Sequence, residues 1–361
     1  MRWLASRGRW WNLKVGLVCM CVSAMHATPT WDNYHQDNGV TVRKGLHPLT
    51  HLVDLSVGSR GHAAKIDFRF VVPLLLRPFH GSLLLASALF AICGVVTYAL
   101  LAEELRRRNV APIAILLSLS GVAATALGGV FLLAWTFYDA AAIALAVAAG
   151  CVRSRLAAVV LALVAIYTDE RALLALVVSV LASLWLDRDR ADAQPRGLTP
   201  RVLVVVIGIY VVSRGVLDAT TDLRTERSDV GLRVLSDNIH IWPKALVGAF
   251  AFWWIVLAIG LVLAAQRQRV VGRLLVVAAA SLVLASAAVY DITRSVSYLL
   301  PLVPVPVVAI TRRWPGVASA RIFGAAFVAC ALTPAFIAVG PVVMFKPLPI
   351  NLLRAVGVFG S

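Results

Sequence analysis

The sequence predicts an all-α bundle of transmembrane helices, and both its composition and its apolar runs support that fold class. Hydrophobic residues make up 60% of the 361 positions and charged residues only 14%, and the mean hydropathy is +0.85. Ordinary water-soluble domains are much less apolar. The runs 81–102 and 245–265 also reach the roughly 20 apolar residues that a helix needs to cross the hydrocarbon core. We therefore expect residues 1–361 to form a single integral membrane domain.

The polar interruptions between the apolar runs are of two alternating kinds. The first kind is short and rich in arginine, and comprises residues 2–14, 103–109, 153–155, 187–201, 266–273 and 311–321. The second kind comprises residues 28–80, 137–140, 168–171, 213–244 and 291–298 and the C-terminus. The first kind carries 19 of the 34 Lys and Arg residues. Because short cytoplasmic loops are enriched in these residues, we place the first kind and the N-terminus in the cytoplasm.

This alternation gives a bundle of about eleven spans. The first apolar segment, VGLVCMCVSAMHA, has basic residues before it and small residues at its end, as a signal peptide has. We expect an uncleaved first span, because further membrane segments follow. The net charge of +16 reflects the loops on one side of the membrane, so the expected partner is the lipid bilayer and not nucleic acid. The five cysteines have no spacing typical of disulfides or metal sites.

Two of the outer connectors, 28–80 and 216–244, are long. A connector of such length inside a compact bundle usually has a task of its own. In the first connector we expect a short helix that lies on the membrane surface around residues 46–55. The same connector carries several charged side chains in a partly apolar stretch: Asp32, Asp37, Asp67, Arg69 and Arg77.

Three further outer interruptions place ionisable side chains close to membrane depth. They are Asp139, then Asp169, Glu170 and Arg171, and finally Asp291 and Arg294. Ionisable groups there cost several kcal/mol unless they are paired or hydrated, so they are functional candidates by default. A common cavity that opens to the outer face is the simplest single explanation.

Each of these interruptions also has a purely structural interpretation. Thr168 suits a helix N-cap, and the two acids that follow it would then occupy the first turn, where the helix dipole favours negative charge. Asp139 can cap a span among interfacial aromatic residues. Asp291 and Arg294 are three residues apart on one helical face and can neutralise each other.

Motif searches return no nucleotide-binding, zinc-protease or serine-hydrolase signature. His47 and His51 have the spacing of a metal-binding pair, but Pro48 lies between them and no third ligand is evident. We therefore expect no cofactor, and a divalent metal is not indicated.

The layout resembles the GT-C superfamily of integral membrane glycosyltransferases, including its poorly characterised bacterial members. The resemblance depends on an acid soon after the first span, Asp32, and on four short motifs. These motifs are DFRFVVPLLLR (67–77), FYD (137–139), TDERALLAL (168–176) and DITRSVSYLLP (291–301). It extends over nearly the whole chain in layout, but only these pieces are specific.

The resemblance implies an inverting enzyme that transfers a sugar from a polyprenyl-phosphate donor to a glycan, lipid or protein acceptor. The reaction would take place at the outer face of the bacterial cytoplasmic (inner) membrane. Asp32 matches the family's first-loop acid, Asp37 and Asp67 are the next choices, and Asp139 matches a second acid. The residues implied for substrate and lipid-phosphate binding are Arg69, Arg77, Asp169, Glu170, Arg171, Asp291 and Arg294. The first loop lacks the paired acids or DxD of better-known members, which leaves the general base open.

Two other classes of protein compete with this interpretation. The segment 299–310, with Pro301, Pro304 and Pro306, has the pattern of the broken helices that line substrate pathways in transporters, which favours a transporter or a lipid-carrier flippase. The same prolines can also mark a kinked span at the edge of a bundle. The third class is a non-catalytic subunit of an envelope-biogenesis complex.

Overall fold

The computed structural model describes residues 10–27, 69, 71–76, 78, 83–132, 138–188, 195–220, 232–237, 239–289, 292–333, 335–338 and 342–345. The helices of the first half are α2 (Trp11–Ala27), α5 (Val71–Leu76), α6 (Leu83–Arg107), α7 (Pro112–Ala123), α8 (Ala126–Gly129), α9 (Asp139–Cys151), α10 (Arg155–Thr168) and α11 (Ala172–Asp187). Those of the second half are α12 (Pro200–Thr220), α13 (Leu232–Asp237), α14 (Trp242–Phe250), α15 (Trp253–Arg267), α16 (Arg269–Ala287), α17 (Ile292–Val296), the 3-10 helix η2 (Ser297–Leu302), α18 (Pro304–Arg313) and α19 (Val317–Leu332).

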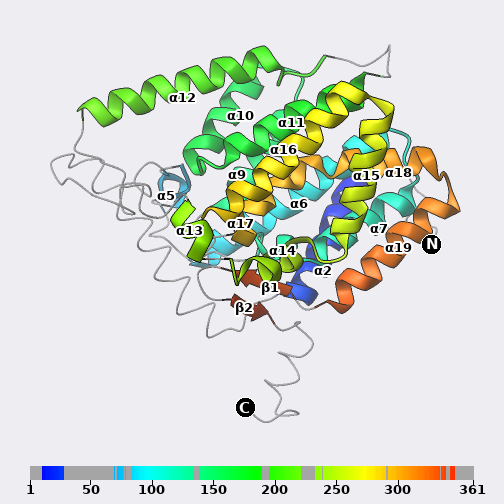
Figure 1. The fold of residues 1–361 in the computed structure, drawn as a ribbon. Helices are drawn as coiled ribbons and strands as arrows, with labels where there is room; N and C mark the ends of the chain where they lie inside the picture. The colour runs from blue at the N-terminus through cyan, green and yellow to red at the C-terminus, as the bar shows by residue number, and fades with distance from the viewer. Residues whose placement is uncertain are drawn as a thin grey trace, which may run out of the picture.

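Helix α9 lies in the interior of this bundle. Its sequence, DAAAIALAVAAGC, consists mainly of small residues, and most of them are buried. Small side chains allow neighbouring helices to approach closely. Helices α6, α10 and α11 and the 3-10 helix η2 all pack against α9. At the edge of the bundle, α12 packs against α10 and α11 (Figure 1), and several of its large apolar side chains, such as Val204 and Val212, are exposed.

Among the described residues, three helices are long and apolar enough to cross a membrane: α6, α12 and α16. Two bent pairs, α14 with α15 and the segment Ile292–Leu302 with α18, raise this number to five if each pair counts as one span. Five further apolar helices, α7, α9, α10, α11 and α19, are shorter. The prediction of a helical bundle with membrane-spanning helices is confirmed at this level, whereas the eleven-span count and the orientation stay predictions.

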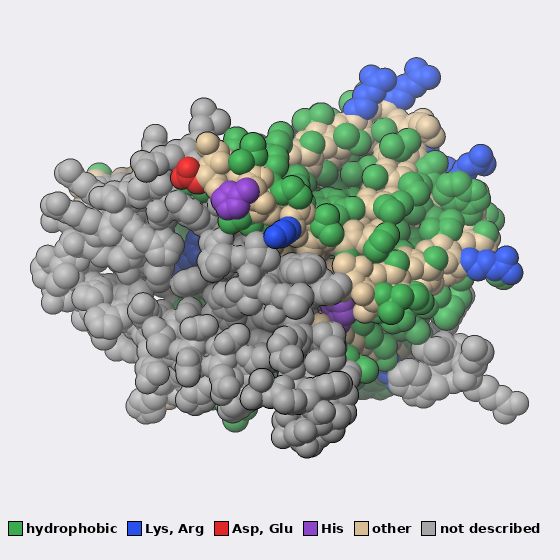
Figure 2. Space-filling view, turned by 60° about the horizontal axis from the view of Figure 1, so that its bottom comes forward, with side chains coloured by type: hydrophobic (Ala, Val, Ile, Leu, Met, Phe, Trp, Pro, Cys, Tyr) green, Lys and Arg blue, Asp and Glu red, His purple; other side chains and the backbone are tan. Residues whose placement is uncertain are grey.

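The surface of the bundle is largely apolar. Figure 2 shows hydrophobic side chains over most of the described surface, with Lys and Arg side chains at its right-hand edge. Leu84 on α6, Val204 on α12 and Leu332 on α19 are 79%, 68% and 80% exposed. Soluble proteins rarely expose contiguous apolar area on this scale. Lipid tails are the solvent that suits such a surface.

The run 245–265, which the sequence predicts as one straight span, is broken in the structure. Helices α14 and α15 meet at an angle of 79°, and Ala251 between them has a φ of 46°, in the left-handed region. Alanine rarely adopts this conformation, because its Cβ crowds the backbone there. Neither glycine nor proline occurs at the bend, so the sequence carries no local signal for it.

The proline-rich segment from α17 to α18 is also broken, and it lies in the interior. Its two parts meet at 51°, with Pro301 inside the 3-10 helix. Proline has no backbone N–H to donate and clashes with the preceding turn, which explains the break. All residues of η2 are buried, so the interpretation of this segment as a kinked span at a bundle edge is wrong.

Helices α15 and α18 cross very closely at Gly260, where a Cβ would lie 2.1 Å from the Cβ of Pro306. We expect Gly260→Ala to lower the free energy of unfolding by about 1–3 kcal/mol, as overpacking does in well-packed cores. The melting temperature in detergent measures this effect. Gly208→Ala on α12 is the matched control, because a Cβ there meets nothing within 4 Å. Equal melting temperatures of the two variants would contradict the close crossing.

A short β-hairpin follows α19, which the all-α prediction omitted. Strands β1 (Ala335–Ala338) and β2 (Val342–Phe345) pair antiparallel, with Ala335 opposite Phe345 and Ala338 opposite Val342. Both strands are rich in the β-branched and aromatic residues that favour strands. Strand β1 packs against α14 and α17. The hairpin therefore lies against the helical bundle, beside α17.

Candidate functional site

The candidate site is built around Asp139, the first residue of α9. Its side chain is completely buried. Oδ1 accepts hydrogen bonds from Arg171 Nη2 at 2.7 Å and from the Tyr298 hydroxyl at 2.8 Å. Oδ2 accepts one from Arg294 Nε at 2.6 Å. One carboxylate thus collects side chains from the start of α11, from α17 and from η2.

The turn between α10 and α11 holds Arg171 in place. Oδ1 of Asp169 accepts hydrogen bonds from the backbone N–H and from Nε of Arg171, both at 2.9 Å, and Oδ2 accepts one from Nη2 at 2.7 Å. Nη1 of Arg171 donates to Ser295 Oγ at 3.1 Å. Charge-assisted bonds with several fixed partners leave the guanidinium little freedom. Arg171 is therefore oriented before any ligand arrives.

The prediction that Thr168 caps the next helix is wrong. Thr168 is the last residue of α10, and its Oγ1 donates to the carbonyl of Val164 at 2.7 Å. The side chain of Asp169 takes the role near the start of α11 instead, through its bond to the backbone N–H of Arg171. Asp139 does not serve as a helix cap either, because its carboxylate accepts hydrogen bonds from two arginines.

Arg69 connects the long outer connector to this site. It precedes α5, and its Nη1 lies 3.0 Å from Oδ2 of Asp169. Its Nη2 lies 3.9 Å from Glu170, which in turn lies 3.9 Å from Arg214 on α12. Burial decreases along this series, because the side chain of Asp139 is completely buried whereas that of Glu170 is 38% exposed. The site therefore extends from the interior toward the surface.

The Asp169 carboxyl is held in its charged form. Burial alone opposes ionisation, but the nearby guanidinium groups of Arg171 and Arg69 outweigh it and hold the pKa of Asp169 below its usual value. A carboxylate with a lowered pKa is a weak proton acceptor. Asp169 is thus suited to fix arginines and poorly suited to act as a general base.

We call the group Arg69, Asp139, Asp169, Arg171, Arg294 and Tyr298 the Asp139 cluster. Five of the residues predicted for the site lie in it, and a sixth, Glu170, lies at its rim. The predicted residues Asp32, Asp37, Asp67, Arg77 and Asp291 lie outside the described residues. Tyr298 and Ser295 were not predicted for the site. A tyrosine within a buried apolar run was the available signal, because a buried tyrosine hydroxyl usually requires a hydrogen-bond partner.

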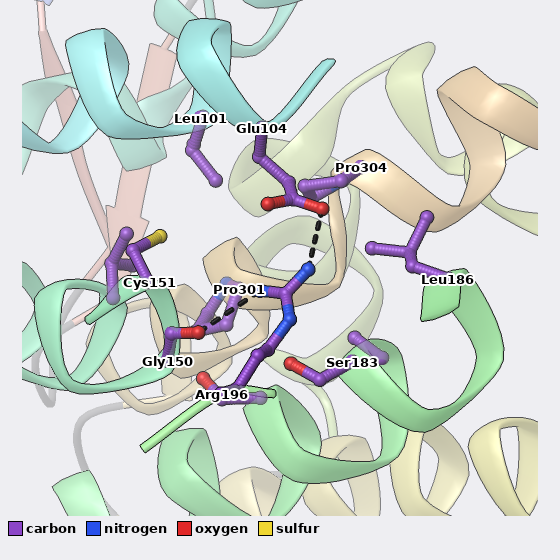
Figure 3. Close-up of a pocket in the computed structure, with 12 residues that line it drawn as sticks. Leu101, Glu104, Gly150, Cys151, Ser183, Leu186, Arg196, Pro301 and Pro304 are labelled. Carbon is purple, nitrogen blue, oxygen red and sulfur yellow. Dashed lines mark hydrogen bonds and ion pairs between the residues drawn. The ribbon is translucent and has the colours of Figure 1, made fainter. Parts of the chain in front are cut away.

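A second group of charges, Glu104, Arg108, Asp187 and Arg196, is called here the Glu104 cluster. Oε1 of Glu104 accepts hydrogen bonds from Arg108 Nε at 2.9 Å and from Arg196 Nη2 at 2.6 Å. Arg196 also donates from Nε to Asp187 Oδ2 at 2.7 Å and from Nη1 to the Gly150 carbonyl at 2.9 Å. Figure 3 shows Arg196 extended between Glu104 and Gly150.

A small cavity of about 30 Å³ lies beside this cluster. Pro301 and Pro304 of the broken segment line it together with Glu104 and Arg196 (Figure 3). Its volume suffices for one or two water molecules. The broken segment therefore contacts both clusters, since Arg294 and Tyr298 lie at its other end.

The two clusters lie at opposite ends of α9. Asp139 begins this helix and Gly150 is near its end, which separates them by about 17 Å at 1.5 Å per residue. Two arginine-rich interruptions, 103–109 and 187–201, meet in the Glu104 cluster, whereas 137–140, 168–171 and 291–298 meet in the Asp139 cluster. For these five interruptions, the two kinds of loop correspond to the two ends of α9.

The fold and the site define a class: a helical bundle with an apolar surface and a buried arginine and carboxylate cluster at one end. Among the described residues no group of three or more His, Cys, Asp or Glu side chains could hold a metal ion. Comparisons with protein-family models, with curated proteins and with solved structures found no match for this chain.

Proposed function

We propose that the protein is an integral membrane glycosyltransferase that transfers a sugar from a polyprenyl-phosphate donor to an acceptor at the outer face of the bacterial cytoplasmic membrane. The observation that supports this proposal is the convergence of Arg69, Arg171 and Arg294 at one end of the bundle. These arginines come from three distant parts of the chain and are fixed by shared carboxylates. Guanidinium groups held in this way are suited to bind a phosphate.

The charge balance of this region favours an anionic ligand. Counting only residues that the structure describes, and including Glu170 and Arg214 at the rim, four arginines face three carboxylates, which is one positive charge in excess. Arg69 and Arg171 are about one-seventh exposed, so both can be reached from the surface. Nε of Arg69 is buried and has no hydrogen-bond partner within the described part of the chain. A buried donor of this kind is costly until it finds an acceptor.

In this proposal Asp139 positions the arginines and does not abstract the proton. Both of its oxygens already accept hydrogen bonds from guanidinium groups, and its side chain is completely buried, so it is poorly placed to reach an acceptor hydroxyl. The general base is then one of Asp32, Asp37 or Asp67 in the outer connector, whose C-terminal part leads to Arg69.

The proposed reaction is a single displacement. The acceptor hydroxyl attacks the anomeric carbon while the base takes its proton, and the bond between that carbon and the phosphate oxygen breaks. Polyprenyl phosphate leaves with the bonding electron pair. Arg171 and Arg69 stabilise the negative charge that develops on this phosphate. Inversion at the anomeric carbon follows from a single attack on the face opposite the leaving group.

Sugar transfer in membranes that contain the protein tests this function, with polyprenyl-phosphate sugars offered as donors. Arg171→Lys is the informative variant, because lysine keeps the charge but loses the fork of donors that holds Asp139, Asp169 and Ser295. We expect it to reduce transfer by at least about tenfold, the factor for one lost charge-assisted hydrogen bond. Asp32→Asn, Asp37→Asn and Asp67→Asn test the base, and one of these three variants should abolish transfer.

Arg196→Lys is the matched control for this experiment. Arg196 also pairs with two carboxylates and is also mostly buried, but it lies at the opposite end of α9. Its variant should keep transfer activity wherever the protein is folded. Full activity of Arg171→Lys together with all three aspartate variants would contradict the proposal.

A transporter or lipid-carrier flippase is the second candidate function, and the broken segment favours it. This segment is buried, bends by 51° and contacts both charged clusters. Irregular buried helices that connect two ends of a bundle are typical of substrate pathways. Accumulation of a labelled polyprenyl-phosphate sugar in vesicles, without transfer to an acceptor, would support this function. The absence of both activities in folded protein would favour the non-catalytic subunit.

A further inference from the structure

The turn between α6 and α7 is tightly defined. Asn109 follows α6 in the left-handed conformation, with a φ of 59°. The N–H of Asn109 donates to the carbonyl of Arg106, and the N–H of Val110 donates to that of Leu105. This is the hydrogen-bond pattern of a Schellman motif, which satisfies the last carbonyls of a helix. The end of α6 and the start of α7 are therefore held side by side.

A cavity of about 20 Å³ lies at this turn and is lined by Trp11, Arg106, Asn109, Val110, Pro112 and Ile115. Trp11 is only 3% exposed. Its indole N–H is buried and has no hydrogen-bond partner in the described part of the structure. Because an indole nitrogen can only donate, it requires an acceptor atom. The volume suffices for one oxygen atom of a ligand that extends outward.

The start of α7 also lies at this cavity, which Pro112 and Ile115 line. The N-cap, Ala111, has no side chain that could accept a hydrogen bond from the first turn, and Pro112 occupies the first helical position. The N–H groups of Ile113 and Ala114 therefore have no acceptor within the helix. The positive end of the helix dipole points the same way. Donors without acceptors at a helix start form a favourable place for an anion.

The charges around the cavity also favour an anion. Arg106 and Arg107 both pair with Glu103, each at 2.8 Å. In the described part of the chain, two arginines therefore share this carboxylate. Their side chains are 45% and 42% exposed, so they are almost equally accessible, but only Arg106 lines the cavity.

The position of the cavity identifies the source of the anion. It adjoins the last turn of α6, one of the helices long and apolar enough to cross a membrane. The end of such a helix lies at the level of the lipid headgroups. Trp10, which is 64% exposed beside the cavity-lining Trp11, belongs to a residue type that is enriched at this level. Phosphate groups of lipids are abundant there, and anionic lipids are attracted to basic residues.

We propose that this cavity binds a phosphate oxygen of an anionic lipid, with Trp11 and Arg106 as donors and the first turn of α7 behind them. This is independent of the proposed transferase function. The site would retain one lipid molecule at the end of the bundle opposite to the Asp139 cluster.

Vesicles of a zwitterionic lipid with and without phosphatidylglycerol test this site. We expect the anionic lipid to raise the melting temperature of the purified full-length protein. Arg106→Gln should lose most of this rise and weaken lipid binding, measured by native mass spectrometry, by about tenfold, the factor for one charge-assisted hydrogen bond. Trp11→Phe should act in the same direction, because it keeps the ring and removes only the N–H.

Arg107→Gln and Trp10→Phe are the matched controls, and both should keep the full rise. Equal losses in Arg106→Gln and Arg107→Gln would mean that surface charge alone attracts the lipid, which overturns the site. If Trp11→Phe does not fold, the comparison of Arg106→Gln with Arg107→Gln still tests the site. A rise produced by inorganic phosphate alone would overturn the assignment to a lipid.

Discussion

Replacing Asp139 with alanine is expected to lower the free energy of unfolding by about 3–5 kcal/mol, the usual cost of removing one partner from a buried ion pair. The side chains of Asp139 and Arg294 are 0% and 1% exposed, so water cannot replace the lost carboxylate. Arg171 keeps Asp169 as a partner, whereas Arg294 loses the bond at 2.6 Å. Denaturation in detergent micelles, followed by tryptophan fluorescence, measures this loss.

The double variant Asp139→Ala with Arg294→Met separates the charge effect from the loss of packing. Methionine has a similar length and no charge, so the double variant leaves no guanidinium of Arg294 beside the missing carboxylate. We expect the double variant to be more stable than Asp139→Ala alone. A cost of less than about 1 kcal/mol for the single variant would instead be typical of an exposed ion pair, and would contradict the buried cluster.

The sequence predicted the site better than it predicted the course of the helices. Asp139, Asp169, Arg171 and Arg294 stand out because each interrupts an apolar run, and an ionisable group in such a run requires partners. The structure brings these four together. Which carboxylate pairs with which arginine could not be predicted, because this depends on the packing of α9, α11 and α17.

The remaining parts of the site could be predicted less well for a physical reason. A buried tyrosine such as Tyr298 indicates that its hydroxyl needs a partner, but the sequence does not indicate that this partner is Asp139. The hydrogen bond of Ser295 to Arg171 has no signal in the sequence. The bend at Ala251 depends on tertiary contacts and not on a helix-breaking residue. The Glu104 cluster could have been predicted, because Glu104 and Asp187 are acids within arginine-rich loops. Those loops were interpreted only as indicators of membrane orientation.

Replacing Glu104 with alanine is the second change from which we expect a large effect, a loss of about 3 kcal/mol in the free energy of unfolding. This is the lower end of the range for a broken buried pair, because Asp187 still accepts a hydrogen bond from Arg196. Glu104 and Arg108 are both at most 5% exposed, which keeps the penalty high. The same denaturation experiment measures it, and Glu103→Ala is the control, since the carboxylate of Glu103 is 21% exposed.

The combination of Glu104→Ala with Asp139→Ala distinguishes the two candidate functions. Sites farther apart than about 10 Å usually have additive effects, within about 0.5 kcal/mol, and the two clusters lie at opposite ends of α9, about 17 Å apart by its rise per residue. A transferase with its chemistry at one end requires no coupling between the two sites, so the two stability losses should simply add. A transporter requires that the two ends share a conformational change, and the broken segment between Arg294 and Pro304 is the element that would connect them. A clear departure from additivity would therefore favour the transporter, whereas additive losses would favour the transferase.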